Sequence, residues 1–196
     1  MPYVEGRVVH DADSHLMELP DSLDAYFDPR FRAAYDELPK LRKNSRNADW
    51  VKKAQAQHDN DDFRSGADAN VLLRKNYEAH GSFRREDRPR TLDNLGFASQ
   101  LIFTTWCLGN FGLDESGPVD LAYAAAQAHN RMMVDFCSVD RRFLGTGYVP
   151  LVEFDLAKTA AREAIDLGCK ALLVPSKPPM GHSPSHIGHD PIWAMA

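Results

Sequence analysis

The residues best suited to chemistry lie near the start of the chain, in Asp11-Ala12-Asp13-Ser14-His15. They follow the apolar run Val8-Val9, so they stand at the end of a predicted first β-strand. Side chains two apart on a strand point to the same face, so Asp13 and His15 are expected to converge on one ion, with Asp11 behind them. A carboxylate and a neutral imidazole suit Zn²⁺ first, and Mn²⁺ or Fe²⁺ as alternatives.

The same motif has a structural alternative. Asp, Ser and His after a strand are ordinary turn and helix-capping residues. A catalytic zinc also needs about three protein ligands and an open position, and this motif supplies two. The spacing alone therefore leaves the metal site and the capping role both open.

The rest of the chain alternates short apolar runs with helical patterns. Apolar residues three and four apart predict a helix over Val119–Val139, and Asp155 is a suitable N-cap for a second helix that stops at Gly168. This order predicts an α/β fold with a parallel sheet and right-handed crossovers. The predicted strands are Arg7–Ala12, Gln100–Thr105, Phe143–Val149 and Lys170–Val174.

Residues 39–90 interrupt this order and predict a partly helical insertion, after a helix near Ser22–Ala25. The insertion carries a basic cluster, which would either bind an anionic substrate or a partner subunit or form a solvated face. The cluster comprises Arg84, Arg85, Arg88 and Arg90.

The amino-acid composition limits which classes of protein this chain can belong to. The 196 residues, 43% of them hydrophobic, are long enough for one domain over 1–196, and the net charge of −5 argues against a nucleic-acid partner. No run reaches the ~18 apolar residues of a membrane span, and the first residues carry no secretory signal, so we expect a cytoplasmic protein without a membrane partner. Cys107, Cys137 and Cys169 suggest no disulfide framework.

The last residues of the sequence indicate whether the predicted domain is whole. Asp190 and Pro191 read as an N-cap and first-turn proline, with the helix barely begun at Ala196. Four strands are half of an eight-stranded barrel, which typically needs ~250 residues. The sequence therefore predicts the N-terminal half of a (β/α)₈ TIM barrel; the alternative is a small open four-stranded sheet.

Several motifs, in order, resemble one family. Asp11–Glu18 is similar to the opening of the amidohydrolase-related proteins, in the branch that includes aminocarboxymuconate-semialdehyde decarboxylase and γ-resorcylate decarboxylase. The passage His129–Gly145 is similar to that branch's helix-to-strand passage. Three shorter stretches follow in the expected order: Tyr148–Leu151, Leu167–Ala171 and Asp190–Trp193.

The resemblance implies a barrel with one divalent metal at the carboxyl ends of its strands. Many relatives have His-x-His in the first strand; here Asp13 takes the first position, as a carboxylate does in some relatives, and His15 matches the second. Glu18 completes a DxHxxE pattern that is common in this branch, without an assigned chemical role. The resemblance places the general base and the remaining ligands beyond residue 196.

Other residues are secondary candidates. His182, His186 and His189 crowd the loop after the fourth predicted strand, where they would contact substrate, complete a metal site or form an exposed polar loop. Lys177 lies near the place of a bridging lysine in binuclear amidohydrolases, but reads as a surface residue. Trp106 would either line a pocket for an aromatic substrate or pack against neighbouring side chains at the strand end.

Two functions follow. The first is a metal-dependent enzyme that acts on a small molecule. Such an enzyme would either hydrolyse an amide or ester or decarboxylate a small carboxylic acid, aromatic acids included. The second is a non-catalytic truncated half-barrel or scaffold. Open sheet edges predict a homo-oligomer.

Overall fold

The computed structural model describes residues 2–37 and 48–196. One parallel sheet forms the centre, with its strands in the sequential order β1-β2-β3-β4. The strands are β1 (His10–His15), β2 (Ser99–Phe103), β3 (Phe143–Tyr148) and β4 (Ala171–Leu173).

Helices connect the strands and build the insertion. The α-helices are α1 (Pro29–Asp36), α3 (Ala48–His58), α4 (Asp61–Ser65), α5 (Arg88–Leu95), α6 (Leu113–Ser116), α7 (Val119–Cys137), α8 (Phe154–Leu167) and α9 (Asp190–Trp193). Single 3₁₀ turns are η1 (Asn76–Glu78), η2 (Arg85–Asp87), η3 (Cys107–Gly112) and η4 (Ile187–His189).

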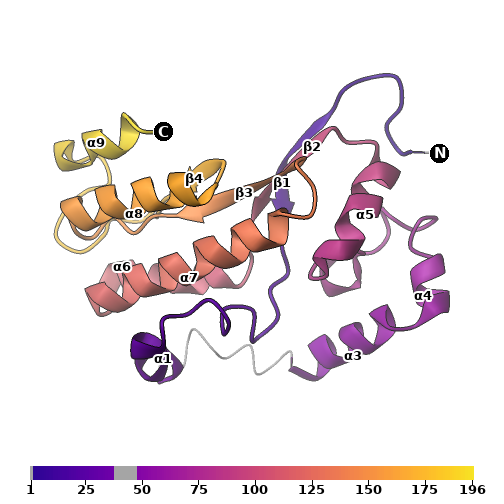
Figure 1. Ribbon diagram of the computed structural model, residues 1–196, viewed down its shortest axis with the longest axis horizontal. Helices are drawn as coiled ribbons and strands as arrows, with labels where there is room; N and C mark the ends of the chain where they lie inside the picture. The colour runs from indigo at the N-terminus through magenta and orange to yellow at the C-terminus, as the bar shows by residue number, and fades with distance from the viewer. Residues whose placement is uncertain (1, 38–47) are drawn as a thin grey trace.

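The helices α7 and α8 lie side by side across one face of the sheet (Figure 1). When parallel strands follow one another in sequence order and every crossover has the same hand, all connecting helices lie on one face of the sheet. In a doubly wound sheet the strand order reverses at one point, and the helices cover both faces. The fold is therefore the N-terminal half of a (β/α)₈ barrel, as the sequence predicts. The insertion helices α3 and α4, and the helix α5 that leads on to β2, lie together to the right of β1 in Figure 1.

Two glycines of β3 allow this close packing. A Cβ at Gly145 would lie 2.8 Å from Met133 Cγ of α7, and one at Gly147 would lie 2.8 Å from Cys169 Sγ. The α7 helix also bonds to the end of β3, because the Asn130 amide accepts from the Tyr148 backbone N–H at 2.7 Å. The helix layer is thus fixed against the strand at both its middle and its end.

Most predicted elements are confirmed, with shifted ends. The first strand is the main correction: it runs over His10–His15 rather than Arg7–Ala12, so the motif is part of the strand. Residues 20–26 form turns rather than a helix, and the first helix begins at Pro29 behind the cap Asp28. The cap of α8 is Glu153 rather than Asp155, whereas its stop at Gly168, with φ +113°, is as predicted.

The remaining predictions about the chain have mixed outcomes. The three cysteines are buried and free. Of the predicted insertion, residues 39–47 lie outside the described residues; from residue 48 on it is partly helical, and its domain boundaries stay a prediction. Over the ranges that the structure describes, we find no helix that is both long and apolar enough to span a bilayer.

Candidate metal centre

The two predicted ligands face each other at the end of β1. Asp13 Oδ1 lies 3.4 Å from His15 Nε2. In a tetrahedral zinc site with bonds of about 2.0–2.1 Å, neighbouring ligand atoms are about 3.3 Å apart. The pair already has the separation of two ligands to one ion, and it is open to solvent, with 88% of the Asp13 side chain and 43% of the His15 side chain exposed.

A β-bulge places Asp13 there. The strand pairing of β1 with β2 gains one residue on β1 between Asp11 and Ser14. Such an extra residue redirects a side chain relative to the regular alternation, and bulges are common beside active sites. Ser14 then points into the protein, while Asp13 and His15 share the open face.

The ring of His15 is oriented by the strand next to it. His15 Nδ1 lies 3.0 Å from the Thr104 carbonyl and 3.1 Å from Thr105 Oγ1. A carbonyl only accepts, so Nδ1 carries the ring proton and Nε2 presents its lone pair toward Asp13. Histidine ligands in metalloproteins commonly donate their second N–H in this way.

A buried arginine supports the strand from below. Arg88 is 5% exposed, and its guanidinium donates to Ser14 Oγ (2.6 Å), to the His15 carbonyl (3.1 Å) and to Gln100 Oε1 (3.2 Å). Burial lowers the pKa of Arg88 to about 10, which leaves it charged at neutral pH. Gln100 in turn donates to Asp11 Oδ2 at 3.0 Å, so Asp11 supports the site from behind rather than joining the pair.

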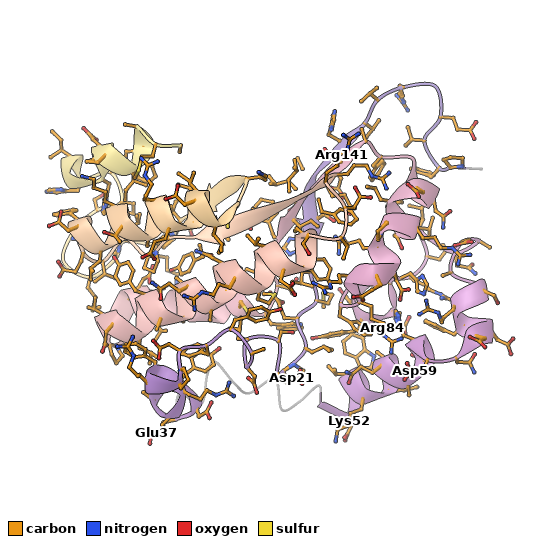
Figure 2. All side chains as sticks on the ribbon, in the orientation of Figure 1. Asp21, Glu37, Lys52, Asp59, Arg84 and Arg141 are labelled. Atoms are coloured by element: carbon orange, nitrogen blue, oxygen red, sulfur yellow. The ribbon has the colours of Figure 1, made fainter. Side chains whose placement is uncertain are left out.

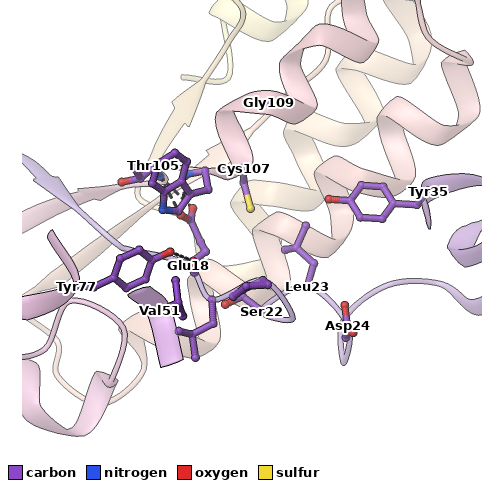
Figure 3. Close-up of a pocket in the computed structure, with 13 residues that line it drawn as sticks. Glu18, Ser22, Leu23, Asp24, Tyr35, Val51, Tyr77, Thr105, Cys107 and Gly109 are labelled. Atoms are coloured by element: carbon purple, nitrogen blue, oxygen red, sulfur yellow. Dashed lines mark hydrogen bonds between the residues drawn. The ribbon is translucent and has the colours of Figure 1, made fainter. Parts of the chain in front are cut away.

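Glu18 acts as a structural crosslink. Its buried carboxylate accepts the backbone N–H groups of Thr105 (3.0 Å; Figure 3) and Trp106 (2.9 Å), and it also accepts the Thr104 hydroxyl. Burial raises the pKa of Glu18, and these hydrogen bonds act against that rise. The last residue of the DxHxxE pattern thus joins the segments that follow β1 and β2, and its oxygens are occupied.

A cavity of about 260 Å³ lies beside Glu18 (Figure 3). Trp106 and Tyr77 line it, and Tyr77 donates to the Glu18 carbonyl at 2.5 Å. The cavity includes Thr105, the neighbour of His15, but neither Asp13 nor His15. Trp106 therefore does wall a cavity, next to the predicted ligands rather than around them.

The fit to a metal is partial. Asp13 and His15 supply one oxygen and one nitrogen, which is a donor set that zinc accepts. Among residues 2–37 and 48–196, no third His, Cys, Asp or Glu completes a set with these two. A catalytic zinc takes about three protein ligands, so the pair is part of a site, and its role stays a prediction.

The other histidine candidates do not converge on one point. The rings of His182, His186 and His189 gather around Phe154, with centroids 4.6–5.0 Å from its ring. Their nitrogens do not form a compact ligand set within the described part of the chain. Lys177 lies on the surface and pairs with Glu115 at 3.1 Å, as expected for a surface lysine.

The basic cluster of the insertion is paired within the chain. Arg84 lies 2.5 Å from Asp59, and Figure 2 shows the two side chains side by side at the insertion. Arg85 pairs with Asp135 at 2.6 Å, Arg90 pairs with Asp68, and Arg88 is buried. These pairs favour the solvated face that the sequence left open for Arg84, Arg85 and Arg90, whereas the buried Arg88 fits neither alternative.

One compact ligand set was not predicted. His58, His80 and Asp87 are buried, and each offers an atom within 4.8 Å of the other two. They come from the end of α3, the loop after η1 and the end of η2. Because 22 and then 7 residues of mostly irregular chain separate them, no helix or strand spacing could have brought them together beforehand.

Comparison with known proteins supports the fold. No protein-family model and no curated protein matches the chain. A solved structure is similar: an amidohydrolase from Mycobacterium avium subsp. paratuberculosis K-10, with a TM-score of 0.66 and 18% identity, over 98% of this chain. This chain spans 55% of the length of that protein. At this identity the likeness concerns the fold, and it agrees with the half-barrel described above.

Proposed function

We propose that this chain supplies the first-strand ligands of a metal-dependent enzyme of the amidohydrolase type. The observation that carries the proposal is the Asp13–His15 pair, 3.4 Å apart and at the C-terminal end of a barrel strand. Active sites of such barrels lie at that end. The similar solved structure is that of an amidohydrolase, which supports the same class.

The residues of the chain have separate tasks in this proposal. Asp13 and His15 would hold one divalent ion, Zn²⁺ by donor set, with Mn²⁺ and Fe²⁺ as alternatives. When bound, such an ion supplies Lewis acidity toward a carbonyl or carboxylate oxygen. Thr104 sets the tautomer of His15, and Arg88 and Glu18 position the two strand ends.

The substrate class follows from the same site. An open mouth with one divalent ion suits a small molecule that carries an amide, an ester or a carboxylate. We propose one of two reactions: hydrolysis of an amide or ester, or decarboxylation of a small carboxylic acid, aromatic acids included. The second candidate, a non-catalytic half-barrel or scaffold, is less favoured because it gives no reason for the orientation of His15. Self-association and a cytoplasmic location also remain proposals.

Calorimetric titration with zinc tests the ligand pair. The Asp13→Asn and His15→Gln variants should each bind one zinc fewer per chain than the unmodified protein. His10→Gln is the matched control: His10 lies on the same strand but bonds to Ser99 Oγ at 2.7 Å, so zinc binding should not change. Unchanged zinc binding in both ligand variants would contradict the proposal.

A further inference from the structure

The cluster of His58, His80 and Asp87 contains buried nitrogens without partners. His58 is 1% exposed, and its Nε2 lies 2.9 Å from the Tyr77 carbonyl. Since a carbonyl only accepts, Nε2 carries the proton and Nδ1 carries a lone pair. Among the described residues, nothing donates to that Nδ1. A buried acceptor without a donor destabilises the fold, so we expect another group to bind this nitrogen.

His80 presents a second such atom. It is 7% exposed, its ring stacks on that of His58 with centroids 5.5 Å apart, and its Nε2 has no hydrogen-bond partner in the described part of the chain. That nitrogen lies 3.7 Å from Asp87 Oδ2. Two imidazole nitrogens without hydrogen-bond partners and a carboxylate therefore lie in one buried cluster.

The carboxylate of Asp87 already has one partner. Arg64 donates to both oxygens of Asp87, at 2.6 and 3.0 Å. Arg84 has its own carboxylate partner, Asp59. A carboxylate oxygen that accepts one hydrogen bond still has a second lone pair for a ligand.

We propose that His58 Nδ1, His80 Nε2 and Asp87 Oδ2 bind a divalent cation, for which zinc is the best fit. Each of the three residues offers one ligand atom within 4.8 Å of the other two, and three such atoms have a common point within about 2.8 Å of each, against zinc bonds of about 2.0–2.1 Å. Shifts of about 0.7 Å would close the set. Two imidazoles and one carboxylate are a ligand set that zinc takes in proteins, with the fourth position left for water.

The site is separate from the Asp13–His15 pair and has a structural task. Its ligands join the end of α3, the loop after η1 and the end of η2, next to the small core cluster that contains Val51 and Ala54 of α3 and Tyr77 of η1. Asp87 precedes Arg88, whose guanidinium supports β1, and Gly81 beside His80 accepts from that same guanidinium at 3.0 Å. The bound ion would fix the insertion against the strand that carries the predicted ligand pair.

Metal titration of a variant without the first pair tests this site. The background is the full chain with Asp13→Ala and His15→Ala, so failure of the proposed function leaves the test intact. We expect it to bind one zinc per chain, to gain thermal stability with zinc, and to give the absorption bands of low-coordinate Co²⁺ when titrated with cobalt. Adding His58→Gln or His80→Gln should weaken zinc binding by more than about 100-fold.

His189→Gln in the same background is the control. His189 is also fully buried, with two ring nitrogens that lack partners among the described residues, but it belongs to the histidines around Phe154. Its replacement should leave zinc binding unchanged. The proposal is overturned if the background protein binds no zinc and gives no cobalt bands while circular dichroism shows that it is folded. That result is expected if a buried water, and not a metal ion, bonds to the two histidine nitrogens. Equal loss of binding in His189→Gln and His80→Gln would overturn it as well.

Discussion

At the scale of single residues, two buried carboxyl groups near strand ends have different surroundings. Glu18 accepts from two backbone N–H groups and a hydroxyl, yet burial still raises its pKa. Asp114 accepts from the Tyr148 hydroxyl, whereas its Oδ1 has no hydrogen-bond partner among the described residues. Burial therefore raises the pKa of Asp114 to about 6.

Asp114 should make the stability of the protein depend on pH. Its pKa is raised from 3.8 to about 6 in the folded state, so the folded protein binds this proton more tightly than the unfolded chain does. Its contribution to stability is full at low pH and is lost as the pH rises through about 6, by at most ~3 kcal/mol. Urea unfolding of Asp114→Asn should lack this part of the dependence. Parallel pH profiles for the variant and the unmodified protein would argue against it.

At the scale of elements, the sequence predicted regular structure well and contacts between distant segments poorly. The spacing of Asp13 and His15 placed both on one face, and three of the four strands were predicted to within about two residues. The first strand was misplaced because its outward face is polar, so its hydrophobic pattern is weak. The partners of Glu18 lie 86 to 88 residues away in an irregular segment, and no local pattern encodes such a contact.

The packing of helices on β3 gives a prediction at this scale. Gly147→Ala would place a Cβ 2.8 Å from Cys169 Sγ and 3.0 Å from Ala164 Cβ, so the helix layer must shift. Overpacking of this kind costs about 1–3 kcal/mol in the free energy of unfolding, which chemical denaturation measures. Gly112→Ala is the control, since nothing lies within 4 Å of its added Cβ. Equal stability of the two variants would show that the sheet and helices have room.

At the scale of the whole molecule, the sheet is covered unevenly. Ile102 of β2 is fully buried beneath the helices, whereas Leu101 and Phe103 point the other way and are only partly buried. Leu144 of β3 pairs in register with Leu101, so apolar side chains of two strands lie together on that face. Apolar surface of this kind is normally covered by other protein.

We therefore expect the chain to self-associate through this face. Sedimentation velocity should show dimers or larger species that grow with protein concentration. Leu144→Lys should weaken association by about tenfold or more, because it brings like charges together at the contact. Leu167→Lys, on the exposed side of α8, should have little effect. A monomer at all concentrations would contradict this expectation.

The central claim is that Asp13 and His15 together bind a divalent ion, and paramagnetic NMR tests it most directly. Mn²⁺ added to the ¹⁵N-labelled chain broadens amide signals near its binding site. We predict broadening centred on the end of β1, at residues 12–16 and at the neighbouring Thr104 and Thr105, in the unmodified protein and in His10→Gln, and its loss in Asp13→Asn. Signals of β1 that stay sharp while Mn²⁺ broadens other regions would contradict the claim.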